Sequence, residues 1–241
     1  KRQEERVKSV SDTLRLSSFL NLPARKLTAD QKQLISLGRG LVREDVAGVL
    51  MDEPLTVIDP DLKFRLRRNL KEINEQYKTT LVYVTHDQNE AMTFADNIIV
   101  MDQGEIVQVG LPKDLFERPK TTFVGYFIGS PAMNIFESEV SSDYSVKINN
   151  IEIKTNSNLS KIKDKNVKLG IRSEFINVAE KEGQNTIKAL LTRVEDFGNF
   201  KLLTANMGDC VIKSKVNREM PISNGDINLY IPPEKLSLIH I

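Results

Sequence analysis

The sequence predicts an α/β domain followed by a smaller all-β domain. In the first half of the chain, helical and strand-like segments alternate, and this order is typical of layered α/β folds. Beyond about residue 130, short strand-like runs separated by Asn, Gly and Asp dominate, which is typical of a small antiparallel sandwich or barrel. We place the boundary between residues 128 and 136, and this predicts domains of residues 1–130 and 131–241.

The composition is that of an ordinary globular protein. The 241 residues are 40% hydrophobic and 28% charged, which excludes a disordered chain because such chains bury too little apolar surface. The 34 basic and 33 acidic residues give a net charge of +1, so overall charge favours neither nucleic acid nor an anionic membrane as a partner. Cys210 is the only cysteine, which excludes an internal disulfide and fits a reducing compartment.

Four segments of the first domain have the pattern of helices. Residues 4–16 carry apolar side chains at helical spacing. Residues 28–42 begin with a Thr-x-x-Gln sequence, which is a capping box and predicts a helix that starts there. Residues 61–77 predict a charged amphipathic helix with one apolar face, and residues 87–94 predict a short one.

Four further segments of this domain predict strands. Residues 46–51 and 80–84 are short, continuous apolar runs, which are typical of parallel strands buried on both faces. Residues 98–101 and 105–109 are separated by Asp-Gln-Gly, which favours a tight hairpin turn.

In the second domain, the strand-like runs come at short intervals and are bounded by turn residues. We expect strands over residues 145–148, 152–155, 167–171, 186–195, 200–205, 210–216 and 227–231.

Three side chains that can bind a metal ion or transfer a proton follow the two apolar runs. Asp52 and Glu53 come directly after the first run, and His86 comes directly after the second. Because the carboxyl ends of parallel strands meet at one edge of a sheet, these side chains are expected to lie together. An Asp there can hold Mg²⁺ through water, and the Glu can polarise an attacking water. On the residues alone, a solvated strand end and a structural histidine remain the alternatives.

Taken together, these segments resemble the ATP-binding subunits of ABC transporters. Residues 49–55 (VLMDEPL) resemble the Walker B strand, residues 56–59 (TVID) the D-loop, and residues 83–91 (YVTHDQNEA) the switch-histidine loop. Their order and spacing agree with the family over residues 27–134. The resemblance implies that the α/β domain is the C-terminal part of an ABC ATPase domain, which is a partial P-loop NTPase fold.

The rest of the chain resembles one branch of that family. Residues 123–134 (FVGYFIGSPAMN) are similar to the join between the ATPase and the accessory β domain in carbohydrate-importer subunits of the maltose type, and residues 169–172 (LGIR) and 233–236 (PEKL) look like landmarks of that β domain. The resemblance implies an OB-like all-β domain that serves dimer contacts and regulation. Residues 27–31, 36–40 and 53–60 most resemble the subgroup that imports glycerol and related polyols.

The resemblance also implies roles for the residues at the strand ends. In an intact dimer, Asp52 would hold Mg²⁺ through water, Glu53 would be the general base, and His86 would contact the γ-phosphate. Asp59 would act across the dimer interface. The signature motif would face the nucleotide bound to the opposite subunit, and it is formed here by Leu27, Thr28, Ala29, Asp30 and Gln31.

The signature motif departs from the family pattern Leu-Ser-Gly-Gly-Gln. Thr28 keeps a hydroxyl, but Ala29 and Asp30 add bulk, and Asp30 adds negative charge where a phosphate would approach a helix N-terminus. One expectation is that a composite site using this motif is weaker or differently tuned. The other is that Asp30 turns outward and caps the helix. Both remain open at this point.

No P-loop is present, because none of the 12 glycines is followed by Lys. We therefore expect a chain without the nucleotide-binding N-terminal half of the family, either as a fragment or naturally, which binds ATP weakly or not at all by itself. The resemblance implies that the parent protein is an ATP- and Mg²⁺-dependent subunit energising import of a carbohydrate or polyol such as glycerol or glycerol 3-phosphate. The alternative is a non-catalytic regulatory or dimerisation module of such a transporter.

The resemblance implies partners and a location as well. The chain would pair with a second ATPase subunit, identical or different, and dock on transmembrane permease subunits that act with a solute-binding protein. Nucleic acid is not expected among its partners. The subunit would lie in the cytoplasm, held on the inner face of the cell membrane through the permease.

Overall fold

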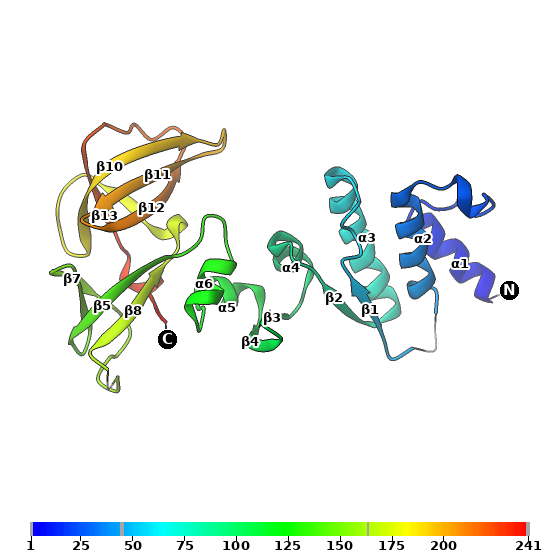
Figure 1. Ribbon diagram of the computed structural model, residues 1–241, viewed down its shortest axis with the longest axis horizontal. Helices are drawn as coiled ribbons and strands as arrows, with labels where there is room; N and C mark the ends of the chain where they lie inside the picture. The colour runs from blue at the N-terminus through cyan, green and yellow to red at the C-terminus, as the bar shows by residue number, and fades with distance from the viewer. Residues whose placement is uncertain (1, 44–45, 163, 240–241) are drawn as a thin grey trace. The chain divides into compact units, whose positions relative to one another are not determined.

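The computed structural model describes residues 2–43, 46–162 and 164–239, which form two compact units (Figure 1). The first unit spans Lys1–Ala95 and the second Asp96–Ile241. Among the described residues, no helix is both long and apolar enough to cross a membrane. The position of the domain boundary near residue 130 stays a prediction.

The first unit contains helices and a two-stranded parallel sheet. Along the chain its elements are α1 (Arg2–Thr13), α2 (Ala29–Leu41), β1 (Gly48–Asp52), α3 (Pro60–Tyr77), β2 (Thr80–Val84) and α4 (Gln88–Phe94). β1 and β2 pair in parallel from Gly48 opposite Thr80 to Asp52 opposite Val84. The helix and strand predictions for this part of the chain are confirmed, although the first strand begins two residues later than expected.

Local sequence explains how α2 and α3 are fixed. The capping box predicted for α2 is present, with Thr28 as the N-cap and Gln31 bonded back to the Thr28 backbone N–H. The apolar face of α3 buries Leu66, Leu70 and Ile73. These side chains pack with leucines of α2 and the end of α1 in one core, which also includes Met51 of β1.

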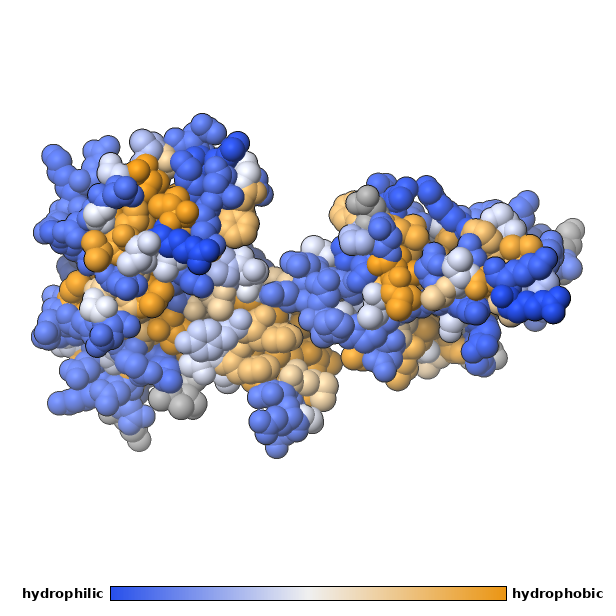
Figure 2. Space-filling model, turned by 45° about the horizontal axis from the view of Figure 1, so that its top comes forward, coloured by the Kyte–Doolittle hydropathy of each residue, from blue (hydrophilic) through white to orange (hydrophobic). Residues whose placement is uncertain are grey.

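The expectation that β1 and β2 are buried on both faces is wrong. Met51 is buried, but Leu50 is 81% exposed, Val82 46% and Val84 53%. Figure 2 shows hydrophobic surface on this unit, at the right of the view. The continuous apolar sequence therefore reflects two apolar faces, of which the helices of the described chain cover only one.

The second unit begins with a hairpin and two short helices. These are β3 (Ile98–Asp102), β4 (Glu105–Gly110), α5 (Pro112–Glu117) and α6 (Thr122–Phe127). Buried Gln108 on β4 donates to the Arg118 carbonyl and accepts from the Lys120 N–H, so its amide fixes the chain between the two helices. The hairpin was predicted, whereas α5 and α6 were not.

The remainder of this unit is two five-stranded antiparallel sheets. One has the order β14-β8-β5-β6-β7 and the other β12-β11-β10-β13-β9. Their strands are β5 (Asn134–Ser142), β6 (Ser145–Ile148), β7 (Ile151–Lys154), β8 (Asn166–Ile171), β9 (Asn177–Ala179), β10 (Thr186–Asp196), β11 (Phe200–Met207), β12 (Cys210–Asn217), β13 (Asp226–Tyr230) and β14 (Ser237–Ile239). All seven strands predicted here are confirmed, and β5, β9 and β14 are additional.

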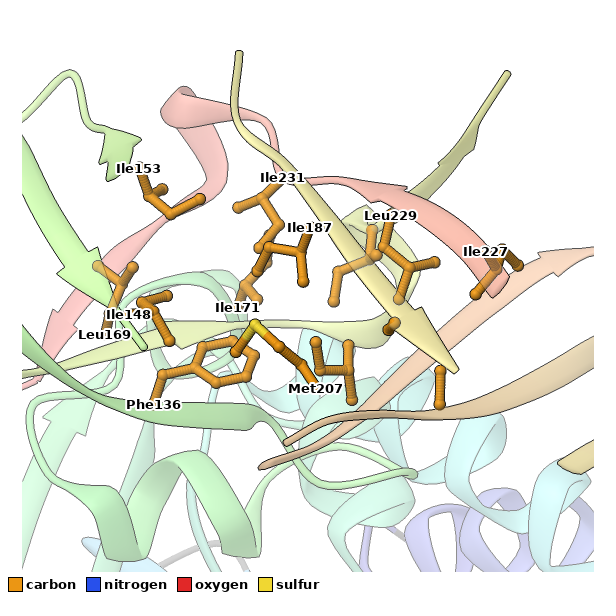
Figure 3. Close-up of a cluster of buried hydrophobic side chains, with 14 of the residues drawn as sticks. Phe136, Ile148, Ile153, Leu169, Ile171, Ile187, Met207, Ile227, Leu229 and Ile231 are labelled. Atoms are coloured by element: carbon orange, nitrogen blue, oxygen red, sulfur yellow. The ribbon is translucent and has the colours of Figure 1, made fainter. Parts of the chain in front are cut away.

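Side chains from both sheets form the core of the all-β part. Figure 3 shows Phe136, Ile148 and Leu169 of the first sheet in one cluster with Ile187 and Leu229 of the second. The alternation of buried and exposed residues along β12 is that of a strand with one face on this core. Two sheets around one core confirm the predicted sandwich-like or barrel-like all-β architecture.

Arg172, directly after β8, is fully buried and joins this sheet to α5 and α6. Its guanidinium donates to the carbonyls of Phe116 (2.8 Å), Gly125 (2.9 Å) and Ile128, and it lies over the Phe116 ring with its Cζ 4.5 Å from the ring centroid. Burial lowers the pKa of Arg172 to about 10, although the negative charge of Glu174 acts in the other direction and raises it. The side chain therefore acts as a charged clamp inside the second unit.

Candidate functional site

The parallel pairing of β1 and β2 brings the predicted residues to one edge. Asp52 ends β1 opposite Val84, the last residue of β2, and Glu53 donates its backbone N–H to the Val84 carbonyl at 3.0 Å. His86 follows two residues after β2. The structure therefore brings Asp52, Glu53 and His86 together, as their positions after the two apolar runs predicted.

The Glu53 carboxylate is held in one place by three donors. Its Oε1 accepts from the His86 backbone N–H at 2.9 Å and lies 2.5 Å from His86 Nδ1, and its Oε2 accepts from the Thr56 hydroxyl at 2.9 Å. Glu53 also has a φ of +46°, a left-handed conformation that is uncommon for a residue with a side chain. The strand end is thus shaped to present this carboxylate towards the second strand.

These contacts set the charge of Glu53. Burial by itself raises the pKa of this carboxyl, but the hydrogen bonds from the His86 ring, Thr56 and the His86 N–H outweigh it and hold the pKa below its usual range. Glu53 is therefore ionised near neutral pH, as a general base must be. Because the folded pKa is depressed, any stability from these contacts is present above the unfolded pKa and is lost as pH falls through the folded one.

Asp52 is a carboxylate at this edge that could hold a metal ion. Its side chain is exposed, and no hydrogen bond to it occurs within the described residues. The described residues also contain no group of three or more His, Cys, Asp or Glu that could hold a metal ion. A single free carboxylate fits a Mg²⁺ ion whose other ligands are waters and a nucleotide phosphate, and it does not fit a site formed by protein ligands alone.

The signature segment lies at the N-terminus of α2. The Thr28 hydroxyl accepts from the Gln31 N–H at 3.5 Å and donates to the Asp30 carboxylate. This hydrogen bond from Thr28, with the backbone N–H groups of the first turn, holds the pKa of Asp30 below its usual range. Thr28 is the N-cap, and Asp30 in the first turn of α2 accepts a hydrogen bond from the Thr28 hydroxyl. How Asp30 would affect a composite nucleotide site stays a prediction.

Two further contacts connect the predicted residues to their surroundings. Gln33 of α2 donates its side-chain amide to the Glu53 carbonyl at 3.0 Å, so the signature helix touches the acidic turn directly. Asp59 is exposed directly before α3, and its carbonyl accepts the Lys63 N–H at 2.8 Å. Its role across a dimer interface stays a prediction.

Sequence reasoning missed a buried carboxylate close to this edge. Glu90 of α4 is 3% exposed, and its Oε2 accepts from the hydroxyls of Tyr83 (2.8 Å) and Thr85 (3.1 Å). Its Oε1 lies 3.6 Å from Lys63 Nζ and 3.5 Å from Arg67 of α3. Glu90 therefore joins the helix that follows Asp59 to the strand and helix that flank His86.

The cations that contact Glu90 are visible in the sequence, but their position gives no indication that Glu90 is their partner. Lys63 and Arg67 are spaced i,i+4 on α3, and the basic residues of a charged amphipathic helix are expected on its solvent face. The structure shows these two side chains only 22% and 18% exposed and directed to Glu90. Burial and the hydrogen bond to Glu90 also raise the pKa of Tyr83 above its usual range, so Tyr83 stays protonated as a donor.

Replacing Glu90 with Ala is expected to destabilise the first unit by about 2 kcal/mol, because two partly buried cations and two hydroxyl groups lose their common partner. Amide hydrogen exchange of α3 and α4 measures this free energy of local unfolding. The control is Glu72→Ala, which removes the exposed Arg68–Glu72 pair of α3 and should cost below about 0.5 kcal/mol. Equal effects of the two substitutions would contradict the role given to Glu90.

The chain is similar to a known family model and to several known proteins. A family model described as the MalK OB fold domain matches residues 129–176. The chain is 34% identical over 233 residues to the oligosaccharides import ATP-binding protein MsmX of Bacillus subtilis, covering 92% of this chain and 63% of that protein. It is 35% identical over 233 residues to the trehalose/maltose import ATP-binding protein MalK of Thermococcus litoralis, covering 92% and 62%.

A third relative is named for the import of a different solute. The chain is 36% identical over 238 residues to the sn-glycerol-3-phosphate import ATP-binding protein UgpC of Yersinia enterocolitica, covering 96% of this chain and 66% of that protein. The chain thus spans 62% to 66% of the length of these three relatives.

Proposed function

We propose that the chain is part of the ATP-hydrolysing subunit of an importer for a sugar or polyol, because it is 34% to 36% identical to these three import ATP-binding proteins. The observation that carries the proposal is the sheet edge where a held, ionised Glu53 lies beside a free Asp52 and an exposed His86. This is the arrangement needed to activate a water beside a bound phosphate.

In this proposal each residue at the edge has one role. Glu53 accepts a proton from the attacking water, and Thr56 and His86 orient its carboxylate. His86 has a largely exposed ring that can turn from Glu53 to a γ-phosphate. Asp52 holds Mg²⁺ through water, and the ion supplies neutralisation of phosphate charge. Asp59 and the signature segment (Leu27, Thr28, Ala29, Asp30 and Gln31) act on the nucleotide across a dimer.

The 241 residues by themselves are proposed to bind MgATP weakly or not at all. A P-loop surrounds phosphates with backbone N–H groups and a lysine, and no Gly-Lys pair occurs in this sequence. The remaining candidate function is a regulatory or dimerisation module, which the match of residues 129–176 to an OB fold domain favours. The ATP-hydrolysing subunit would bind a nucleotide at the sheet edge that carries Glu53, whereas the regulatory or dimerisation module would not.

The partners and location follow from the same proposal. The subunit pairs with a second ATPase subunit, and transmembrane permease subunits receive the pair. A solute-binding protein acts with the permease, and the subunit lies on the cytoplasmic face of the membrane. Similarity to proteins named for oligosaccharides, trehalose/maltose and sn-glycerol 3-phosphate supports a carbohydrate or polyol as the solute class.

The experiment that tests this function is solute uptake into proteoliposomes that contain the permease and the intact ATPase. Uptake is expected only with both ATP and Mg²⁺ on the side that carries the ATPase, and chelation of Mg²⁺ should stop it. Uptake that continues at the same rate without ATP would contradict the proposal.

The signature segment gives a second test of the composite site. Replacing Ala29 and Asp30 together with Gly in the intact protein is expected to raise ATPase activity several-fold. The change frees the Thr28 hydroxyl and removes a carboxylate from a helix N-terminus that is proposed to face a phosphate. Phosphate release at saturating ATP measures the effect, with Ala29→Gly alone as the control for backbone flexibility. Unchanged or reduced activity of the double variant would contradict a weakening effect of Asp30 on the composite site.

A further inference from the structure

A pocket of the second unit lies at one end of the two sheets. It has a volume of about 590 Å³, which is within the range of small-molecule sites. Its walls come from the turn before β6, the end of β7, the loop before β10 and the end of β13. It therefore lies where the ends of both sheets meet.

The floor of this pocket is fixed by a buried amide. Asn185 is 2% exposed, and its side chain accepts from the Lys154 N–H at 2.8 Å and donates to the carbonyls of Lys154 at 2.8 Å and Ile231 at 3.1 Å. One side chain thus joins β7 of the first sheet to the chain after β13 of the second. Asn185 has a φ of +58°, which Asn tolerates better than most residues.

A second set of hydrogen bonds restrains the chain at Thr155, another residue that lines the pocket. The Thr155 N–H donates to the Tyr144 carbonyl at 2.9 Å, and the Thr155 hydroxyl accepts from the Ser157 N–H at 3.1 Å. Thr155 itself is 4% exposed. The backbone beside the pocket is therefore restrained, which reduces the entropy that a ligand would have to offset on binding.

Most polar side chains of the lining residues, by contrast, have no protein partner among the described residues. Within the described chain, neither the Lys154 ammonium nor the amides of Asn156 and Gln184 make a side-chain hydrogen bond or ion pair, and the Tyr230 hydroxyl makes none. The Tyr144 hydroxyl accepts one hydrogen bond, from Asn158 at 3.3 Å, and keeps its own proton to donate. Five polar side chains therefore belong to the lining of one pocket, and most of their hydrogen-bond donors are available to a ligand.

The charge and shape of the lining define the ligand. One cation and no carboxylate line the pocket in the described residues, so an anionic group is favoured next to Lys154. Side-chain amides match hydroxyl groups as both donors and acceptors, and the two tyrosine rings offer apolar surface for the C–H face of a sugar. We propose that this pocket binds a sugar phosphate or polyol phosphate, with its phosphate at Lys154 and its hydroxyls at Asn156 and Gln184.

Binding to the 241-residue chain tests the proposal, because the pocket lies wholly within it. Titration calorimetry with glucose 6-phosphate is expected to show one site, and neutral glucose should bind about tenfold more weakly or worse, because it lacks the charge-assisted contact. Backbone amide shifts in NMR should change at the pocket walls. No heat and no shift changes at millimolar glucose 6-phosphate would overturn the proposal.

Variants locate the site. Lys154→Ala is expected to weaken binding about tenfold or more, and Gln184→Ala several-fold. Lys213→Ala removes a cation that is exposed on β12 and outside the lining, so it should leave binding unchanged. Urea unfolding of each variant checks that the fold is kept, and Gln184→Ala alone decides the matter if Lys154→Ala unfolds. Equal binding by wild-type and both pocket variants would overturn the proposal.

Three other probes decide the ligand class. sn-Glycerol 3-phosphate should bind in the same pocket, since it keeps a phosphate and a hydroxyl. Inorganic phosphate and adenosine 5′-monophosphate should each bind more weakly than glucose 6-phosphate. Tighter binding of inorganic phosphate would reduce the site to an anion site, and tighter binding of the nucleotide would make it a nucleotide site. Either result would overturn the assignment to sugar or polyol phosphates.

Discussion

Replacing Glu53 with Gln in the intact ATPase is expected to abolish steady-state ATP hydrolysis while leaving nucleotide binding in place. The amide keeps the shape of the side chain but cannot take a proton from water, and loss of a general base typically costs about 10²- to 10⁴-fold in rate. Phosphate release measures turnover, and retention of MgATP on a filter or column measures binding.

The matched control for this substitution is Glu75→Gln, which makes the same change at an exposed position of α3. It should leave both turnover and binding unchanged. Turnover that survives Glu53→Gln at the control level would remove Glu53 from the role of base. Loss of nucleotide binding together with turnover would show instead that Glu53 holds the nucleotide or the fold of the strand edge.

The second large effect is expected in the β domain, where Arg172→Ala should destabilise the second unit by about 3 kcal/mol or more. Removing the guanidinium leaves three buried carbonyls without their donor, opens a cavity and ends the contact with the Phe116 ring. Hydrogen exchange of the amides in α5 and α6 measures the loss, because these helices are held to β8 by this side chain.

Two further variants separate the causes of that effect. Arg172→Lys keeps the charge but cannot donate from a planar fork, so an intermediate loss is expected. Arg193→Ala removes an exposed arginine of β10 that pairs with Glu195, and it should cost below about 0.5 kcal/mol. A loss of stability in Arg172→Ala no larger than that in Arg193→Ala would contradict the role of Arg172 in holding α5 and α6 to β8.

The features that could be predicted from the sequence are those encoded by neighbouring residues. The capping box of α2 and the strand runs that end at Asp52 and at Val84 depend on local pattern, and all are observed. The meeting of Glu53 with His86 was also predictable, because parallel strands share an edge.

The features that could not be predicted depend on residues far apart in the chain. Glu90 contacts α3 side chains more than twenty positions away, and nothing in either segment alone marks them as partners. The exposed face of β1 and β2 escaped prediction for a related reason. An apolar run shows that two faces are suited to burial, but it does not show which of them is covered.

Strand β5 was missed because residues 134–142 follow directly on a segment interpreted as the join between domains, although they alternate in burial along much of their length. The hydrogen bond between Thr28 and Asp30 was missed because the departure of the signature motif from its pattern was considered in terms of bulk and charge. The structure adds that the hydroxyl and the new carboxylate bind each other.

The most direct test of the central claim is ATP-driven solute uptake by proteoliposomes that contain the permease and the intact ATPase with Asp52→Asn. If the edge of β1 and β2 holds Mg²⁺ and hydrolyses ATP to drive import, this variant should assemble with the permease and show no ATP-dependent uptake. Uptake at the wild-type rate by the assembled Asp52→Asn complex would contradict the claim.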